Sequence, residues 1–265
     1  MRPLTALAVL PLITLFWLSA RAELPPRLQF CADAAQWPPF SYSDSQGMMH
    51  GYTVDLVERI FADSPHQASV EQLPWRRCLA ATEQGKQFQV ALDASSSDER
   101  RRKFLLSRDY YQLTPYYFYS MRSFPDGLSI NSGSELGQHG TICGIAGYSY
   151  TNFALGNTPI YKEMKDFATL KEMAHRGRCA TFIGRFEIVS GLANLGIDLL
   201  RDPQLGYAPI PDAQSEPFYM LISRNLADAD KLKQQIDQTI DALEASGELR
   251  RMKEKHGIKN QPMNK

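Results

Sequence analysis

The sequence predicts an α/β protein in which mainly parallel sheets are covered by helices. In the first half of the chain, short apolar runs alternate with segments whose apolar residues recur at helical spacing. The middle of the chain repeats this alternation, and no strict internal repeat, low-complexity tract or long linker interrupts it. Alternating strands and helices favour parallel strand pairs, because each such pair needs a crossover connection.

The individual elements follow from local patterns. We expect strands at residues 27–31, 70–73, 89–93, 141–145, 179–183, 205–210 and 218–222. We expect helices after Gly51, at 76–84, from a capping box at Thr169–Glu172 to Gly177, at 187–195, and on both sides of Ser246-Gly247. Pro38 and Pro39 exclude regular structure from the aromatic loop at 36–42.

The N-terminus has the features of a secretory signal peptide. Arg2 precedes an apolar run from Leu4 to Leu18, and Ala20 and Ala22 form an A-x-A cleavage site, so we expect residues 1–22 to be removed after Ala22. A membrane anchor is the alternative, but the run is shorter than the roughly 20 residues of a membrane span and contains Pro11. Because Glu23, and not a cysteine, directly follows the cleavage point, a lipid anchor is not expected.

Charge and length limit the classes of function. Removal of residues 1–22 takes away Arg2 and Arg21 and no acid, which leaves 27 basic side chains against 29 acidic ones, a net charge of −2. This balance gives no electrostatic basis for binding nucleic acid or an anionic membrane. The remaining 243 residues suffice for one large domain or two small lobes.

All four cysteines, Cys31, Cys78, Cys143 and Cys179, lie after the signal peptide. An even number in an exported chain favours disulfides over metal binding or catalysis. Their spacing includes no C-x-x-C motif, and the five histidines do not cluster around them, so we expect neither a zinc site nor another cofactor. Three pairings are possible.

A stretch from Val90 to Tyr111 predicts a carboxylate site. An apolar run ends in Ser95, Ser96 and Ser97, and Arg100 follows a few residues later. Hydroxyl groups and backbone N–H groups at a strand end, together with a planar guanidinium, can bind a carboxylate. The alternative is a helix start whose basic residues face water.

Several motifs together resemble the type II periplasmic solute-binding proteins, specifically the bacterial extracellular solute-binding family 3 of the polar amino-acid ABC transporter type. The matching segments occur in family order over nearly the whole mature chain: Trp37-Pro38-Pro39-Phe40-Ser41-Tyr42, Gly51-Tyr52-Thr53-Val54-Asp55-Leu56, Pro74-Trp75, Ser95 with Asp98-Glu99-Arg100, Gly147-Tyr148-Ser149, Gly177-Arg178, Ser246-Gly247-Glu248-Leu249 and His256-Gly257.

The resemblance implies two α/β lobes with an open mixed sheet in each and a ligand cleft between them. Residues 23–115 and 213–265 would form the first lobe, residues 116–212 the second, with hinges near 113–119 and 210–216. Ligand would close the lobes by a hinge motion. It further implies a monomer in the periplasm that passes its ligand to an ABC permease of the inner membrane.

The same resemblance suggests ligand-binding residues. Arg100 matches the carboxylate-binding arginine, Ser95 a neighbouring hydroxyl position, and Trp37 and Trp75 the aromatic residues that flank the ligand. Asp33 matches an acid at the end of the first strand. The alternatives are a core role for Trp75 and a turn or cap role for Asp33. Tyr148 and Ser149 are expected ligand contacts from the second lobe.

Two positions depart from the family pattern. Arg185 occupies the place of the acid that receives a ligand ammonium group, and Asp93 stands where a serine is frequent. We therefore expect Arg100 and Arg185 to face each other across the cleft and to bind an anionic or amino-acid-like ligand with an additional acid group. The alternative is that Arg185 points to solvent.

The two-lobe arrangement also selects a disulfide pairing. Cys31 pairs with Cys78 and Cys143 with Cys179 if each bridge stays within one lobe, since a bridge between lobes would be strained when they close.

We expect a binding protein without enzymatic activity. The sequence has no nucleophile motif, paired-carboxylate motif or metal-binding motif. A dehydratase-like enzyme on the same fold is one alternative, with Glu187 and Asp33 as acid or base, and a soluble ligand sensor for a signalling partner is another.

Overall fold

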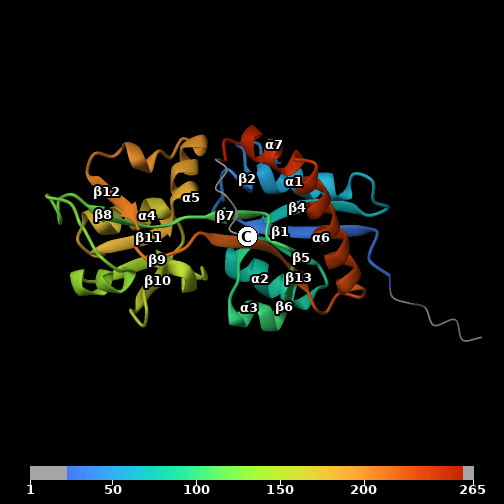
Figure 1. Cartoon of the computed structure of the whole chain (residues 1–265), viewed down its shortest axis with the longest axis horizontal. Helices are drawn as coiled ribbons and strands as arrows, with labels where there is room; N and C mark the ends of the chain where they lie inside the picture. The colour runs from blue at the N-terminus through green and yellow to red at the C-terminus, as the bar shows by residue number, and fades with distance from the viewer. Residues whose placement is uncertain (1–22, 259–265) are drawn as a thin grey trace, which may run out of the picture.

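Two lobes lie side by side along the long axis of the molecule, each a sheet with helices packed on it (Figure 1). The computed structural model describes residues 23–258. The predicted signal peptide, residues 1–22, lies outside the described residues. None of the described helices is long and apolar enough to cross a membrane. The predicted two-lobe α/β fold is confirmed.

The first lobe is built on a mixed six-stranded sheet of order β4-β1-β5-β13-β6, with β7 paired to β13. β1 is parallel to β4 and β5, whereas β13 is antiparallel to its neighbours. The strands are β1 (Arg27–Asp33), β4 (Gln67–Leu73), β5 (Val90–Ser95), β6 (Phe104–Leu106), β7 (Tyr111–Leu113) and β13 (Glu216–Ser223). The helices are α1 (Tyr52–Phe61), α2 (Trp75–Gln84), α3 (Asp98–Lys103), α6 (Ala229–Ala245) and α7 (Glu248–Lys255), and a hairpin consists of β2 (Tyr42–Ser43) and β3 (Met49–His50).

The second lobe is built on a five-stranded sheet of order β10-β9-β11-β8-β12. Its strands are β8 (Pro115–Ser120), β9 (Ile142–Ile145), β10 (Ile160–Met164), β11 (Thr181–Arg185) and β12 (Leu205–Pro209), and its helices are α4 (Phe167–His175) and α5 (Phe186–Gly191). Short 3-10 turns occur at 133–139, 151–153, 192–195 and 199–201.

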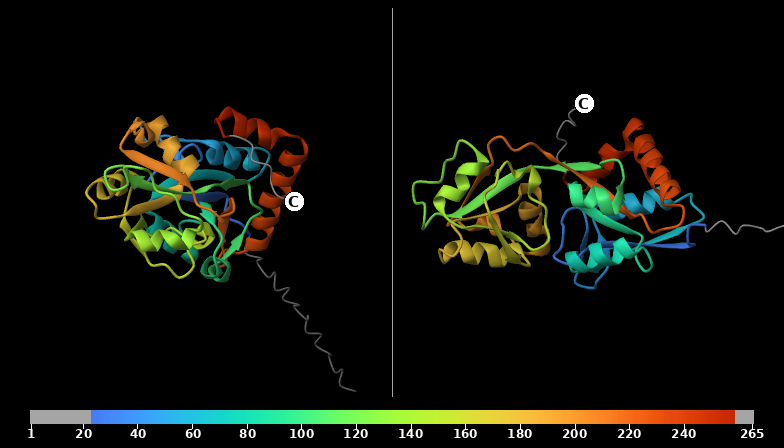
Figure 2. Two further views of the ribbon diagram at one scale, coloured as in Figure 1. Left: turned by 60° about the vertical axis from the view of Figure 1, so that its left-hand side comes forward. Right: turned by 90° about the horizontal axis from the view of Figure 1, so that it is seen from below.

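The chain passes between the two sheets twice. It leaves the first sheet at β7, continues through Thr114 into β8, and returns between β12 and β13. The two crossing segments are adjacent, because Glu216 of β13 pairs with Leu113 of β7 (green and orange in Figures 1 and 2). Both passages fall within the segments that the sequence predicts as hinges.

Sequence patterns misplace some boundaries. The expected capping box at Thr169–Glu172 is wrong: Asp166 caps α4, its carboxylate accepting hydrogen bonds from the Thr169 N–H at 2.7 Å and from the Thr169 hydroxyl at 3.0 Å. The strand predicted at 179–183 is β11, which begins only at Thr181. The N–H groups of Cys179 and Ala180 donate to the carbonyls of Met173 and Thr141, so these two residues precede the regular strand. Strands β2, β3, β6, β7, β8 and β10 were not predicted: β6, β7 and β8 pair with residues remote in sequence, and β10 is a mostly exposed edge strand.

Both predicted disulfides form, one in each lobe. Cys31 of β1 bonds Cys78 of α2, and Cys143 of β9 bonds Cys179 just before β11, with Cα–Cα distances of 5.7 and 5.9 Å. Each bridge ties a sheet strand to a neighbouring element of the same lobe, so the bridges leave the lobes free to move relative to each other.

Loss of the second-lobe bridge should destabilise the protein. The bridge closes a span of 36 residues, for which the chain-entropy model gives about 4 kcal/mol of stabilisation. We expect the double variant Cys143→Ser/Cys179→Ser to unfold at a lower urea concentration than wild type, and reduced wild type, in which both bridges are broken, to unfold at a concentration no higher than that of the variant. Equal midpoints for oxidised and reduced wild type would contradict this expectation.

Candidate ligand site between the lobes

A cavity between the lobes brings together all eight residues predicted to bind ligand. The cavity is small, ≈ 20 Å³, with room for on the order of one water molecule. That these eight residues bind a ligand is a prediction. The residues that line the cavity are Asp33, Trp37, Trp75, Ser95, Arg100, Tyr148, Ser149 and Arg185, together with Leu92, Asp93 and Phe218.

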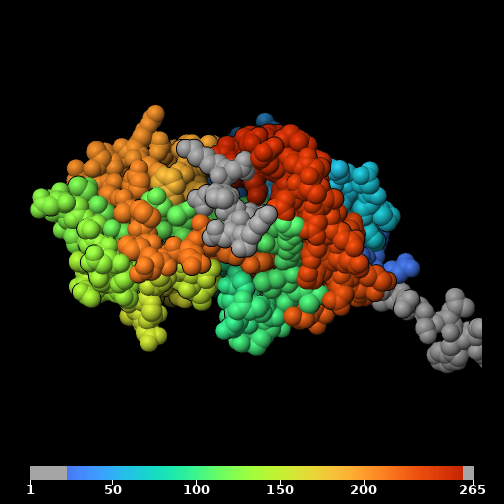
Figure 3. All heavy atoms as spheres, viewed as in Figure 1, coloured from blue at the N-terminus to red at the C-terminus, as the bar shows by residue number. Residues whose placement is uncertain are grey.

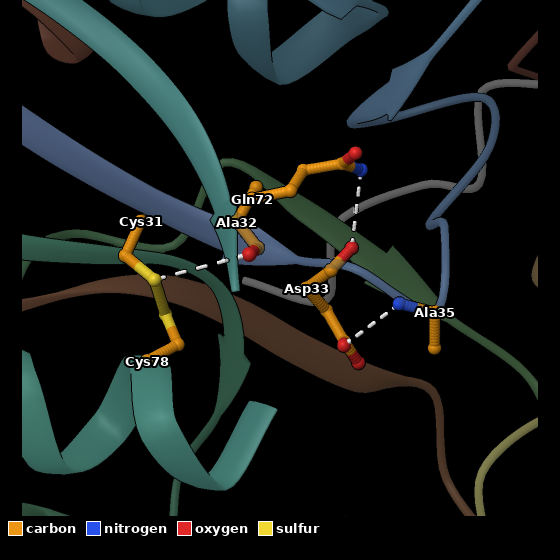
Figure 4. Close-up of a disulfide and its surroundings, with 6 residues drawn as sticks. All are labelled: Cys31, Ala32, Asp33, Ala35, Gln72 and Cys78. Atoms are coloured by element: carbon orange, nitrogen blue, oxygen red, sulfur yellow. Dashed lines mark hydrogen bonds between the residues drawn. A yellow bond between two sulfur atoms is a disulfide. The ribbon is translucent and has the colours of Figure 1, made fainter. Parts of the chain in front are cut away.

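Asp33 lies at the carboxyl end of β1, where the Cys31–Cys78 bridge ties this strand to α2 (Figure 4). Its carboxylate accepts a hydrogen bond from the Ala35 N–H at 3.0 Å and one from the Tyr148 hydroxyl of the other lobe at 2.7 Å. Burial raises the pKa of Asp33, and these hydrogen bonds oppose the shift. Asp33 therefore caps a turn, as the alternative interpretation expects, and also faces the cleft.

Arg100 points into the cleft while the rest of α3 faces water. Its neighbours Arg101–Lys103 are exposed, but Arg100 is buried. One terminal nitrogen donates to the backbone oxygen of Ser95 at 2.8 Å and to the Ser95 hydroxyl at 3.0 Å, and the other donates to the Gly147 carbonyl of the second lobe at 3.4 Å. Burial, together with the nearby charge of Arg185, lowers the pKa of Arg100 to about 10. All of these partners are neutral oxygens, so within residues 23–258 its positive charge has no hydrogen-bonded acid.

Arg185 is paired with an acid that the sequence did not single out. Its Nε donates to Glu216 Oε2 at 2.7 Å, a terminal nitrogen forms a second contact with the same oxygen, and another hydrogen bond reaches the Ser149 carbonyl at 2.8 Å. Arg185 ends β11 of the second lobe, whereas Glu216 begins β13 of the first sheet. Arg185 thus lies in the cleft, and not in solvent, but Glu216 offsets its charge.

Asp93 lines the cavity, but its carboxylate is engaged within the first lobe. It accepts hydrogen bonds from the hydroxyls of Ser41 at 2.5 Å, Thr53 at 2.6 Å, and Tyr110 and Tyr111 at 3.0 Å each. Burial raises its pKa, and the four hydroxyl donors oppose that shift. The residue has a left-handed backbone with φ of 56°, which turns its side chain out of the strand pattern.

Aromatic rings form the apolar part of the cavity. The Trp37 N–H donates to the Tyr111 hydroxyl at 2.9 Å, and the Trp37 ring lies 5.3 Å from Tyr148 and 5.8 Å from Phe218. The Trp75 ring lies 5.5 Å from the Arg100 guanidinium. The sequence did not single out Phe218, although it begins the strand predicted at 218–222; Glu216 lies two residues before it, outside that predicted strand but on the same face of β13.

Two glycines allow the lobes to approach closely. A Cβ on Gly147 would lie 3.2 Å from Cδ1 of Trp75, and φ at this residue is 80°. A Cβ on Gly191 of the second lobe would lie 2.4 Å from the Pro38 carbonyl oxygen. Together with the Tyr148–Asp33 and Arg100–Gly147 hydrogen bonds, these contacts define a closed arrangement of the lobes.

A family model describing bacterial extracellular solute-binding proteins, family 3, matches residues 29–259. The chain belongs to this family. A curated relative is the probable histidine-binding protein of Neisseria gonorrhoeae, 21% identical over 247 residues that cover 91% of this chain and 87% of that protein.

Solved structures share the fold of this solute-binding protein. The arginine-, lysine-, histidine-binding protein ArtJ of Geobacillus stearothermophilus matches with a TM-score of 0.70 at 19% identity, covering 89% of this chain and 97% of that one. The ancestral amino-acid-binding protein AncCDT-1, a precursor of cyclohexadienyl dehydratase, matches with a TM-score of 0.66 at 16% identity, covering 87% of this chain and 95% of that one. Within residues 23–258, no cluster of His, Cys, Asp and Glu side chains is suited to hold a metal ion.

The buried ion pair should be sensitive to removal of one partner. Glu216→Gln leaves Arg185 buried without an opposing charge, so we expect the free energy of unfolding to fall by about 3–5 kcal/mol. The apolar pair Arg185→Met/Glu216→Leu should recover most of this loss, because a buried pair is often replaceable by apolar groups. Urea denaturation measures both variants.

The partly exposed ion pair of Arg59 and Glu248, 2.9 Å apart, provides a matched control. Glu248→Gln should cost less than about 1 kcal/mol. An equal cost for the two glutamate variants would show that burial does not determine the strength of the cleft pair.

Proposed function

We propose that this solute-binding protein captures a small amino-acid ligand between its lobes by binding the ligand carboxylate at Arg100. The observation that carries the proposal is the state of Arg100: a buried guanidinium lines the cavity, and its hydrogen bonds go only to neutral oxygens. A buried charge without an opposing charge is costly, and a ligand carboxylate supplies that charge with favourable geometry.

The other charges of the cleft favour a zwitterion over a dianion. Glu216 offsets the charge of Arg185, which removes the reason to expect a second anionic group on the ligand. Asp33 adds a carboxylate to the cavity lining, opposite in sign to Arg100. A ligand with one carboxylate and one ammonium group matches this pair of charges better than a dicarboxylate does.

The relatives support the same ligand class. Those with named ligands are described as proteins that bind histidine, arginine, lysine or amino acids in general. By this likeness, the protein would bind without chemical conversion and deliver its ligand to an ABC transporter in the inner membrane, acting as a monomer in the periplasm. The sequence predicts an anionic or amino-acid-like ligand, and of these two classes we propose the amino acid.

Isothermal titration calorimetry with L-histidine, L-arginine and L-glutamine, beside succinate and glutarate, tests the proposal. We expect at least one amino acid to bind more tightly than either dicarboxylate. Arg100→Gln should weaken that binding by about 1.5–3 kcal/mol, the range of a hydrogen bond to a charged group. The matched control is Arg101→Gln on the same helix, whose side chain is exposed and whose loss should leave affinity unchanged.

Tighter binding of succinate than of every amino acid would overturn the proposed ligand class. Incubation of the bound amino acid with the protein, followed by NMR of the small molecule, tests for conversion: a new product would establish the enzyme alternative.

Ligand release requires the lobes to separate, which breaks the Tyr148–Asp33 and Arg100–Gly147 hydrogen bonds. Tyr148→Phe removes the first of these bonds, and we expect its ligand-free form to have a larger radius of gyration by small-angle scattering than ligand-free wild type. Saturating amino acid should return the variant to the compact form. Identical scattering of wild type and variant, with and without ligand, would contradict a hinge motion.

A further inference from the structure

The two tryptophans of the cavity differ in how their indole N–H groups are used. Trp37 Nε1 donates to the Tyr111 hydroxyl at 2.9 Å, so this N–H is satisfied within the first lobe. Trp75 Nε1 is buried and has no hydrogen-bond partner among the described residues. The Trp75 side chain as a whole is only 7% exposed. Buried N–H donors are rarely left without a partner, and each exception calls for an explanation.

The unpartnered N–H edge of Trp75 faces the place where the lobes meet. Cδ1, the ring carbon bonded to Nε1, is 3.2 Å from the Cβ position of Gly147 in the second lobe. Arg100 donates a hydrogen bond to the carbonyl of the same Gly147, and its guanidinium lies 5.5 Å from the centre of the Trp75 ring. Trp75 and Arg100 therefore present donors to one region of the cavity.

Among the described residues, the acids that line the cavity are already hydrogen-bonded to donors other than Arg100 and the Trp75 indole. The Asp33 carboxylate already accepts from Ala35 and Tyr148, and the Asp93 carboxylate accepts from four hydroxyls. Glu216 Oε1 is buried without a partner, but its residue does not line the cavity. A ligand group that satisfies both Arg100 and Trp75 must itself provide two acceptor atoms close together, as a carboxylate does.

A groove continues from this region to the surface. It shares Arg100, Tyr148 and Ser149 with the inner cavity and runs between the start of α2, the α3 helix and residues 147–162 of the second lobe. In Figure 3 the teal atoms of the first lobe and the yellow-green atoms of the second face each other at this opening. This groove marks the seam between the lobes that leads toward Arg100 and Trp75, and separation of the lobes along it would expose their donors.

We propose that the Trp75 indole N–H is a direct ligand contact that donates a hydrogen bond to the carboxylate held by Arg100. The role is additional to packing of the ring against the ligand, and it rests on the proposed capture of a carboxylate-bearing ligand. A site that provides a buried donor discriminates strongly against ligands without an acceptor, because the donor is then left unpaired.

Indole N–H resonances in ¹⁵N NMR spectra report on this contact directly. Trp75→Phe and Trp37→Phe each remove one resonance and so assign the two signals. Acetate serves as a minimal carboxylate probe, and L-histidine, L-arginine and L-glutamine serve as full ligands. We expect acetate and any bound amino acid to move the Trp75 proton downfield and slow its exchange with solvent, with a smaller effect on Trp37.

Calorimetry of the two variants provides the second measurement. Trp75→Phe keeps an aromatic ring beside Arg100 and removes the donor, so we expect affinity for the bound amino acid to fall about 10- to 100-fold, the range of one hydrogen bond to a charged group. Trp37→Phe removes a donor that is already satisfied by Tyr111 and should weaken binding less.

These measurements distinguish the Trp75 contact with a carboxylate from the binding of an amino acid. If an amino acid binds while the Trp75 resonance is unmoved and Trp75→Phe keeps wild-type affinity, the inference fails alone. If no amino acid binds but acetate shifts the Trp75 resonance selectively, the inference stands and the amino-acid proposal fails. If neither probe moves the Trp75 resonance, Trp75 is not a carboxylate contact.

Discussion

The buried ion pair of Arg185 and Glu216 is the interaction on which the closed cleft depends. Its two partners come from different sheets, β11 of the second lobe and β13 of the first. Separating them inside the protein would leave a buried charge unpaired, which costs far more than losing a surface contact. Both partners lie beside the crossing strands, because Arg185 pairs with Pro115 of β8 and Glu216 pairs with Leu113 of β7.

This pair also determines which charges remain for a ligand. Rings of Trp37, Tyr150, Phe153 and Phe218 surround the Arg185 guanidinium at 5.1–5.9 Å, and Glu216 holds it by two contacts. Among the described residues, Arg100 has no such acid partner and donates only to neutral oxygens. The cleft thus contains two arginines of different character, because charge compensation depends on neighbours rather than on residue type.

The scaffold explains why these side chains meet in one place. β1 and β5 are parallel, so their carboxyl ends, at Asp33 and Ser95, lie at the same edge of the first sheet. The Cys31–Cys78 bridge holds the start of α2, with Trp75, against this edge. The second lobe contributes the Gly147 loop, which can approach only because a glycine there avoids Trp75 and Arg76.

The sequence by itself determined the fold class, the pairing of the cysteines and the membership of eight side chains in the cleft. The α/β class follows from local periodicity, whereas the two lobes, the cysteine pairing and the cleft residues follow from the family resemblance that the ordered motifs carry. The alternation of strands and helices predicted most of the elements, although not the hairpin of β2 and β3, the edge strand β10, or β6, β7 and β8, whose pairing depends on partners far along the chain.

Only the tertiary structure decided what the charged side chains do. From the sequence, Arg185 is an uncompensated cation opposite Arg100, and Asp93 an acid of unknown orientation. Folding places Glu216 beside the first, 31 residues away in sequence, and four hydroxyls around the second. The unpaired indole N–H of Trp75 is likewise invisible in the sequence, which contains an identical side chain at Trp37 whose N–H is satisfied. Hydrogen bonds and charge compensation act over a few ångströms in space, and the residues that provide them are remote along the chain.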